Sequence, residues 1–261
     1  MENVDDNLNL DGRSARYGNF TNYYEFHPTE FRIKLIPNNV WDLGGNDIVC
    51  LDVGCNSGKL AQALHQHISS TIAFTFKNKK DVPKCYILGV DVSQELIDKA
   101  VETNNNPYIT FKTVDVCSKS GKNVINQYLS CFNRTSFDIV FCFSVTMWIH
   151  LNYGDEALKE FLLYVSNQTD MLVLEPQPWR CYLRAVRRLK RAENGTFEKF
   201  SKLKMRLSIE DDIENILIEE CKFNQVLKTE ETPWGRIITF YKRKKKHKQI
   251  NKINPMRVDH C

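Results

Sequence analysis

The chain has 261 residues, of which 42% are hydrophobic and 26% are charged, and its formal net charge is +4. This length and composition suit one large α/β domain, and no stretch approaches the roughly 18 consecutive apolar residues that a membrane-spanning helix needs. Nine scattered cysteines without a Cys-x-x-Cys pair argue against a disulfide framework and a zinc site. We therefore expect a reducing compartment and no bound metal.

Positive charge gathers in two segments of the chain. Residues 176–206 contain ten Lys and Arg against two Glu, and residues 242–248 contain six more basic residues. Such clustering favours a polyanionic partner over a generally basic protein. We interpret residues 242–261 as a basic tail whose default role is a solvated terminus, with a nuclear address or a non-specific RNA contact as alternatives.

The N-terminal residues are acidic and polar and show no signal-peptide pattern, so we expect a cytoplasmic protein, which the basic tail could also direct to the nucleus. We expect residues 1–16 to be disordered. Residues 17–36 are rich in aromatic and basic side chains. They either pack on the domain or form a lid in which Tyr23, Tyr24 and Arg32 face a ligand, and the two interpretations are compatible.

Strands and helices are predicted to alternate through most of the chain, which we treat as a single domain over residues 17–241. The predicted strands cover residues 48–53, 85–90, 109–114, 137–143 and 171–175, and the predicted helices cover 59–66, 94–103, 121–131 and 154–166. This alternation indicates a parallel sheet with helices on both faces. Two further strands, 223–228 and 237–241, are close enough in sequence to form an antiparallel pair.

A glycine-bounded turn follows the first predicted strand. Gly54 and Gly58 frame the turn, and neither carries a Cβ, so the backbone can turn sharply and approach a ligand before the next helix begins. The spacing is not that of the dinucleotide fingerprint, and an ordinary strand-to-helix turn is the alternative interpretation.

Acidic residues end the next two predicted strands. Asp91 stands where an α/β nucleotide site holds ribose hydroxyls, and no basic residue beside it could receive a 2′-phosphate. Asp115 ends the third strand and could reach an adenine amino group. A polar insertion at residues 71–83 lengthens the gap between the glycine turn and Asp91. The turn and the two aspartates together favour S-adenosylmethionine over a dinucleotide.

The segment Ser144–Asn152 follows the fourth strand, and we expect it to be a loop that borders the ligand site. His150 within it is a candidate general base, but a buried, hydrogen-bonded structural histidine is the preferred interpretation. Asn152 is expected to cap the helix predicted at 154–166.

The fifth strand runs into Glu175-Pro-Gln-Pro-Trp179, where two prolines fix an extended turn before a new helix. Five arginines on that helix fall at i, i+4, i+7, i+8 and i+11 and are expected to make one stripe: Arg180, Arg184, Arg187, Arg188 and Arg191. A charge stripe is usually a solvated face. Here no acid interrupts it and it begins near the expected site, which favours phosphate binding because arginine bonds phosphate in a bidentate manner.

These motifs together resemble the bicoid-interacting family of RNA 5′-phosphate methyltransferases. The matching segments are Tyr17–Phe20 with Tyr23 and Tyr24, Leu51–Gly58, Ser144–Asn152 with Gly154 and Asp155, and Leu174–Trp179. They span most of residues 17–241. Asn-Ser-Gly in the glycine turn and Val-Thr-Met-Trp-Ile-His after the fourth strand are closer to the RNA 5′-monophosphate branch than to the methylphosphate capping branch.

The resemblance implies a class I, Rossmann-like, S-adenosylmethionine-dependent methyltransferase fold, with a mostly parallel seven-stranded sheet and an antiparallel C-terminal hairpin. In the cofactor site, Arg32 would contact the carboxylate of S-adenosylmethionine. The other residues implied for this site are Gly54, Asn56, Asp91, Asp115, Val116 and Phe143. Tyr23, Tyr24 and Gln177 would border and position the 5′-phosphate, and no residue would act as a general base. We add Trp179, Arg180, Arg184, Arg187 and Arg188 as expected RNA or phosphate contacts.

The reaction expected from the resemblance is methylation of the 5′-terminal monophosphate of a small RNA, such as a microRNA precursor or a transfer RNA, by a monomeric enzyme. Two alternatives stay open. One is methylphosphate capping of the γ-phosphate on a 5′-triphosphate small nuclear RNA, and the other is a non-catalytic RNA-binding protein on the same fold.

Overall fold

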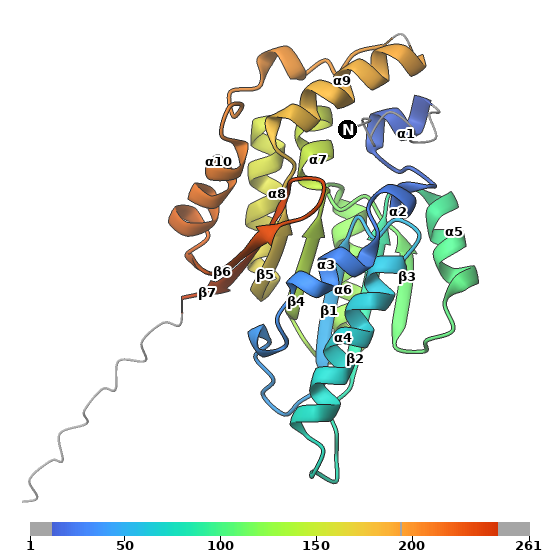
Figure 1. The fold of residues 1–261 in the computed structure, drawn as a ribbon, viewed down its shortest axis with the longest axis vertical. Helices are drawn as coiled ribbons and strands as arrows, with labels where there is room; N and C mark the ends of the chain where they lie inside the picture. Colours follow the sequence, from blue (N-terminus) through green and yellow to red (C-terminus); the bar gives the residue numbers. More distant parts are fainter. Residues whose placement is uncertain (1–11, 194, 245–261) are drawn as a thin grey trace, which may run out of the picture.

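A computed structural model describes residues 12–193 and 195–244. Its centre is a seven-stranded sheet with the strand order β3-β2-β1-β4-β5-β7-β6 (Figure 1). The strands are β1 (Ile48–Val53), β2 (Cys85–Asp91), β3 (Ile109–Thr113), β4 (Phe137–Phe143), β5 (Thr169–Glu175), β6 (Phe223–Glu231) and β7 (Ile237–Arg243). The first five run parallel, and β7 lies antiparallel between β5 and β6. The prediction of a mostly parallel sheet with an antiparallel C-terminal pair is confirmed.

Helices cover both faces of this sheet. They are α1 (Gly12–Tyr17), α2 (Tyr23–Phe26), α3 (Thr29–Leu35), α4 (Lys59–Thr75), α5 (Gln94–Thr103), α6 (Lys119–Ser130), α7 (Thr146–Tyr153), α8 (Asp155–Asn167), α9 (Trp179–Glu193) and α10 (Ile209–Asn215), with the short turns η2 (Asn38–Val40), η3 (Phe200–Lys202) and η4 (Ile216–Glu220). Apolar side chains of α4 and α5 pack in one core layer, and those of α6, α7, α8 and α9 pack in the other.

The central strand β1 shows why helices cover both faces of the sheet. All six of its residues are buried, with Val49 and Leu51 in one core layer and Ile48 and Cys50 in the other. A strand buried on both faces has a continuous apolar sequence, as parallel strands do. β1 pairs with β2 on one side and with β4 on the other. The order in which the chain adds strands to the sheet therefore reverses between β1 and β4. Open sheets of this kind bind ligands beyond the strand ends at that point.

Helix α4 is longer than the sequence predicted. The apolar residues Leu60, Leu64, Ile68 and Ile72 continue at a spacing of four and stay buried, so the helix runs to Thr75. Its polar residues are accommodated because their hydroxyls bond the preceding helical turn, as the Thr75 hydroxyl does with the Thr71 carbonyl at 2.8 Å. The predicted polar insertion at 71–83 is therefore helical in its first part.

The segment after β4 is the clearest correction. The expected loop over Ser144–Asn152 is mostly the helix α7, and α8 begins after Gly154. Asn152 therefore does not cap α8; its amide donates to the carbonyls of Trp148 and Arg16, both at 2.9 Å. The helix α7 was missed because it is short and is separated from α8 only by Gly154, so its sequence was taken for a loop before one helix.

The two ends of the domain also differ from expectation. Residues 12–17 form α1, whose Ala15 is fully buried, so the prediction of disorder is wrong for residues 12–16. β7 continues to Arg243, so the basic tail begins later than predicted, and residues 1–11 and 245–261 lie outside the described residues. No helix in the described part of the chain is long and apolar enough to cross a membrane.

His150 holds the helical layer together and does not reach the strand ends. It is fully buried, with Nδ1 3.1 Å from the Tyr182 hydroxyl and Nε2 3.1 Å from Asp155 Oδ1. Asp155 also accepts backbone N–H groups from Lys204 and Met205. Burial lowers the pKa of His150, although the bond to Asp155 opposes that shift. The interpretation as a buried structural histidine is confirmed.

Replacing His150 with Ala should lower the free energy of unfolding by about 1–3 kcal/mol, because it leaves the buried Tyr182 hydroxyl without its partner. Urea unfolding measures the change. Lys159→Ala on α8 removes only an exposed ion pair with Glu220 and should change stability little. Equal effects of the two substitutions would contradict the structural role of His150.

Candidate active site

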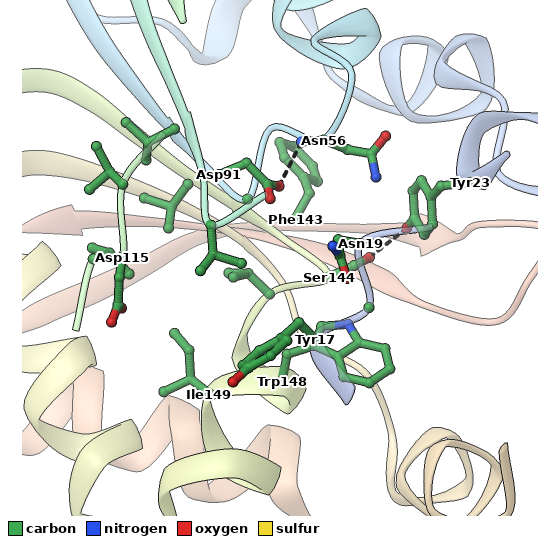
Figure 2. Close-up of a pocket in the computed structure, with 18 of the residues that line it drawn as sticks. Tyr17, Asn19, Tyr23, Asn56, Asp91, Asp115, Phe143, Ser144, Trp148 and Ile149 are labelled. Atoms are coloured by element: carbon green, nitrogen blue, oxygen red, sulfur yellow. Dashed lines mark hydrogen bonds between the residues drawn. The ribbon is translucent and has the colours of Figure 1, made fainter. Parts of the chain in front are cut away.

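A pocket opens at the carboxyl ends of β1 to β4, where the sheet topology places a ligand (Figure 2). We call it the strand-end pocket. The N-terminal segment between residues 17 and 32, the segment 144–153 and Leu60 of α4 supply the remaining walls. Every residue expected to contact S-adenosylmethionine lines this pocket: Arg32, Gly54, Asn56, Asp91, Asp115, Val116 and Phe143.

Two carboxylates mark one side of the strand-end pocket, opposite Tyr23 (Figure 2). Asp91 accepts from the backbone N–H of Asn56 at 3.0 Å, and Asp115 accepts from the backbone N–H of Cys117 at 2.9 Å. Burial raises the pKa of Asp91, and backbone hydrogen bonds oppose that shift. These backbone bonds fix both carboxylates as acceptors for ligand hydroxyl or amino groups.

The glycine turn has the backbone that the sequence predicted. Gly54 and Gly58 have φ of 76° and 75°, in the left-handed region that favours glycine. A Cβ on Gly58 would stand 2.5 Å from the ring of Phe111, so the turn also needs glycine for packing. Asn56 is left-handed as well, with φ of 52°, and its amide donates to the Phe20 carbonyl at 3.0 Å. The Asn56 side chain thus ties the N-terminal segment to the turn.

The N-terminal segment is fastened over the pocket at two further points. The Tyr24 hydroxyl donates to the Cys55 carbonyl at 3.2 Å, and burial keeps the pKa of Tyr24 well above its usual range. Gly18, with φ of 74°, lies so close to Trp148 that a Cβ would stand 2.0 Å from the indole. Residues 17–36 therefore pack on the domain, and Tyr23, Tyr24 and Arg32 among them line the pocket. That this segment covers a bound ligand stays a prediction, and we call it the lid after that prediction.

A buried ionic cluster joins the lid to the ends of β4 and β5 and to the hairpin turn. Arg32 donates from Nε at 2.5 Å and from Nη2 at 2.9 Å to the two carboxylate oxygens of Glu175. Arg236 Nη1 lies 3.3 Å from the same carboxylate. The Ser144 hydroxyl donates to Glu175 at 2.7 Å and accepts from Arg236 at 2.6 Å, and the Tyr23 hydroxyl donates to Ser144 at 3.0 Å.

This cluster carries net positive charge, because two guanidiniums share one carboxylate. Burial would raise the pKa of Glu175, but the charge and hydrogen bonds of Arg32 outweigh burial and lower that pKa to about 2. Two buried nitrogens have no hydrogen-bond partner among the described residues, namely Arg32 Nη1 and Arg236 Nε. Buried donors without partners are unfavourable, so both positions favour an anionic ligand.

A smaller cavity adjoins the strand-end pocket, and we call it the arginine cavity. Its polar lining consists of Tyr23, His27, Trp148, Gln177, Arg188 and Arg236. Arg188 comes from α9, is 5% exposed, and stacks its guanidinium 5.0 Å from the ring of Phe20. Gly18, Tyr23 and Trp148 line both spaces, so the two binding spaces share a wall.

Comparison with known proteins identifies the family of this chain. Residues 137–244 match the model of Bicoid-interacting protein 3, and residues 51–167 match a methyltransferase domain. The chain is 37% identical over 254 residues to a pre-miRNA 5′-monophosphate methyltransferase of Xenopus laevis, covering 93% of this chain and 98% of the relative. The chain belongs to the bicoid-interacting methyltransferase family.

Two further relatives come from the two branches of the family. The chain is 36% identical to an RNA 5′-monophosphate methyltransferase of Mus musculus, covering 91% of this chain and 86% of the relative. It is 31% identical over 191 residues to a U6 snRNA methylphosphate capping enzyme of Drosophila melanogaster, covering 65% of this chain and 55% of that protein.

Methyltransferases of this family use S-adenosylmethionine, and the residues of the strand-end pocket fit that cofactor. The Arg32 Nη1 donor suits its carboxylate, the buried Asp91 carboxylate suits ribose hydroxyls, and the Asp115 carboxylate suits the adenine amino group. Val116 and Phe143 supply apolar wall beside them.

The expected phosphate contacts divide into two groups. Tyr23, Gln177 and Arg188 line the arginine cavity, whereas Tyr24 lines only the strand-end pocket. The Gln177 amide is held by backbone, donating to the Ser144 carbonyl at 2.6 Å and accepting from an N–H of α7 at 3.4 Å.

The other residues of α9 that were expected to contact RNA lie outside both binding spaces. Trp179 stacks on Phe200 at 5.4 Å between ring centroids, which is a packing contact, and exposed Arg180 donates to the Gly235 carbonyl at 2.6 Å. Trp179, Arg180, Arg184 and Arg187 line neither binding space. The five arginines lie on one side of the single helix α9, as the spacing predicted, but their burial differs: Arg188 at one edge of the stripe is buried in the arginine cavity, whereas Arg180 and Arg187 are exposed. Phosphate binding by the stripe as a whole stays a prediction.

Sequence reasoning missed three residues of the ionic cluster. Arg236 preceded the predicted strand 237–241 and was given no role, Ser144 was only the first residue of the predicted loop, and Glu175 was only the end of the predicted fifth strand. An acid at the end of β5, in the position that Asp91 has on β2, was the available signal for Glu175. Ser144 has φ of 57°, which is uncommon for serine and is typical of functional sites, but only a structure reveals it.

Asp91→Asn should weaken S-adenosylmethionine binding about 10- to 100-fold, because a charged acceptor for the ribose is lost while the shape is kept. Calorimetric titration measures the affinity. Asp98→Asn on the exposed face of α5 is the matched control and should bind normally. Normal binding by the Asp91 variant would refute the ribose assignment.

Protein stability should also depend on pH through Glu175. Its pKa is about 2 in the folded protein and near the ordinary 4.5 when unfolded, so its contribution is complete above 4.5 and is lost as the pH falls through about 2. The loss should be on the order of 3 kcal/mol. Urea unfolding between pH 6 and pH 2.5 measures it, and a flat profile would contradict the buried ion pair.

Proposed function

We propose that this protein transfers a methyl group from S-adenosylmethionine to the 5′-terminal monophosphate of an RNA. The observation that carries the proposal is the arginine cavity, which places Arg188 and Arg236 beside the strand-end pocket. Guanidiniums bind phosphate oxygens through paired, charge-assisted hydrogen bonds. Relatives that match this chain over most of their length are named for methylation of RNA 5′-monophosphates.

The arginine cavity is the smaller of the two binding spaces, and we expect it to receive only the terminal phosphoryl group. The relative that acts as a capping enzyme also matches less of this chain, which supports the monophosphate over the triphosphate.

The protein's part in the reaction is positioning. S-adenosylmethionine, held by the residues of the strand-end pocket, would supply a methyl group on a positively charged sulfur, which a phosphate oxygen would accept as the sulfur–carbon bond breaks. A terminal phosphate carries a charge of about −1.5 to −2 at neutral pH, so no general base has to remove a proton. Holding two reactants in line can contribute roughly 7–11 kcal/mol.

Each of the two arginines of the ionic cluster would position one of the two reactants. Arg32 lines the strand-end pocket and has a buried Nη1 without a hydrogen-bond partner among the described residues, and Arg236 lines the arginine cavity. Both are held by Glu175, so neither guanidinium needs to reorient when a ligand arrives. The exposed Arg187 and Arg180 lie outside the cavity, where they are proposed to contact the RNA backbone beyond its first phosphate.

The deciding experiment uses RNAs that differ only in the 5′ group, with labelled S-adenosylmethionine as the donor. We expect transfer to the monophosphate, little to the triphosphate and none to the hydroxyl end. Faster transfer to the triphosphate would favour the capping activity, and binding of the RNAs without transfer would indicate a non-catalytic RNA-binding protein.

Arg188→Ala should lower kcat/KM for the monophosphate RNA about 10- to 100-fold, because one charge-assisted contact is removed, while cofactor affinity stays unchanged. Lys190→Ala removes an exposed charge from the same helix and serves as the matched control. An Arg188 variant with unchanged kcat/KM would remove the arginine cavity from the proposal.

A further inference from the structure

The side chains that line the arginine cavity supply more hydrogen-bond donors than acceptors, and the His27 ring is the one with an acceptor nitrogen when neutral. No carboxylate of the described residues lines the cavity, and Arg236, which does line it, has a buried Nε without a hydrogen-bond partner among them. The Gln177 oxygen already accepts a backbone N–H at 3.4 Å. The Tyr23 hydroxyl donates to Ser144 and accepts from Arg32 at 2.8 Å, so it has little capacity left for another donor.

Such a lining discriminates between forms of one phosphate. A fully deprotonated phosphate monoester offers three oxygens that all accept hydrogen bonds and share two negative charges. Its protonated form brings an O–H group that needs an acceptor, and its methyl ester brings a methyl group into a space of about 30 Å³. Each of these changes also removes one negative charge from contact with buried guanidiniums.

We propose that the arginine cavity selects the dianionic phosphate monoester and rejects the monoanionic methyl ester. This inference rests on the proposed function, because the methyl ester is the product of that reaction. The reaction converts a dianion into a monoanion when the oxygen–carbon bond forms, and no proton is exchanged. The chain thereby binds its substrate end more tightly than its product end, and the methylated RNA leaves.

The test compares two RNAs that differ only in one methyl group, a 5′-phosphate RNA and a 5′-methylphosphate RNA. Fluorescence anisotropy measures their binding to the full chain saturated with S-adenosylhomocysteine. At pH 7.5 the methylphosphate RNA should bind at least about 10-fold more weakly. The ratio should fall toward one by pH 5, because the second pKa of a phosphate monoester is about 6 and the methyl ester does not titrate there.

Other titratable groups face the cavity, and comparing two RNAs reduces their influence on the result. Tyr23 and His27 face it from the lid, Cys181 and Arg188 from α9, and Arg236 from the hairpin. Arg32 and Glu175 stand behind Arg236 and Tyr23. A gain of positive charge on any of them at low pH would strengthen the binding of the dianion more than that of the monoanion and so raise the ratio. The predicted fall of the ratio toward pH 5 therefore has to come from the 5′-phosphate, which loses a charge of its own in this range.

Arg236→Gln should reduce the ratio at pH 7.5 severalfold, and Lys228→Gln, an exposed position on the same hairpin, should leave it unchanged. If Arg236→Gln does not fold, the wild-type ratio and its pH dependence decide. Equal affinities at pH 7.5, or a ratio that stays constant from pH 5 to 8, would overturn the inference. A wild-type protein that transfers no methyl group to any RNA would instead defeat the proposed function, and the two failures are therefore distinguishable.

Discussion

One buried carboxylate, Glu175, brings together segments that are far apart in the sequence. It ends β5, receives Arg32 from the lid helix α3, receives Arg236 from the turn before β7, and accepts the Ser144 hydroxyl from the end of β4. Without it, two guanidiniums would be buried close together with no counter-charge, which costs several kcal/mol per ion. Glu175 therefore joins the lid, the hairpin and the strand ends at one point, in addition to the pairing of β5 with β7 and the other contacts of the lid.

Such a cluster is a poor way to gain stability, because desolvation of the ions offsets much of their attraction. Its position explains its presence better. Arg32 and Arg236 each keep one donor unbonded within the described chain, and these donors belong to residues of two adjoining binding spaces. In the proposed function, the cluster would serve as a preorganised anion receptor with two sides, in which the carboxylate fixes the guanidiniums without neutralising both.

The sequence was sufficient to predict the fold and to predict which residues would line the strand-end pocket, because both depend on local patterns. Alternating apolar segments predicted the sheet, and the glycine turn, Asp91 and Asp115 stand at strand ends that parallel topology brings together. The phosphate side depends on tertiary contacts. Nothing local distinguishes Arg188 from Arg187, and Arg236 reaches the site only because β7 inserts next to β5. Residues supplied by a hairpin distant in the sequence need a structure to be found.

The lid links the two sides of the site physically. Tyr23 lines both binding spaces, and its hydroxyl bonds Ser144 and Arg32 in the ionic cluster. Gly18, packed against Trp148, also lines both. Neither space keeps its wall if the lid leaves, so the cofactor side and the phosphate side form together. A reaction that gains its rate from alignment needs this arrangement, since misplacing either reactant by about 1 Å can cost on the order of 100-fold in rate.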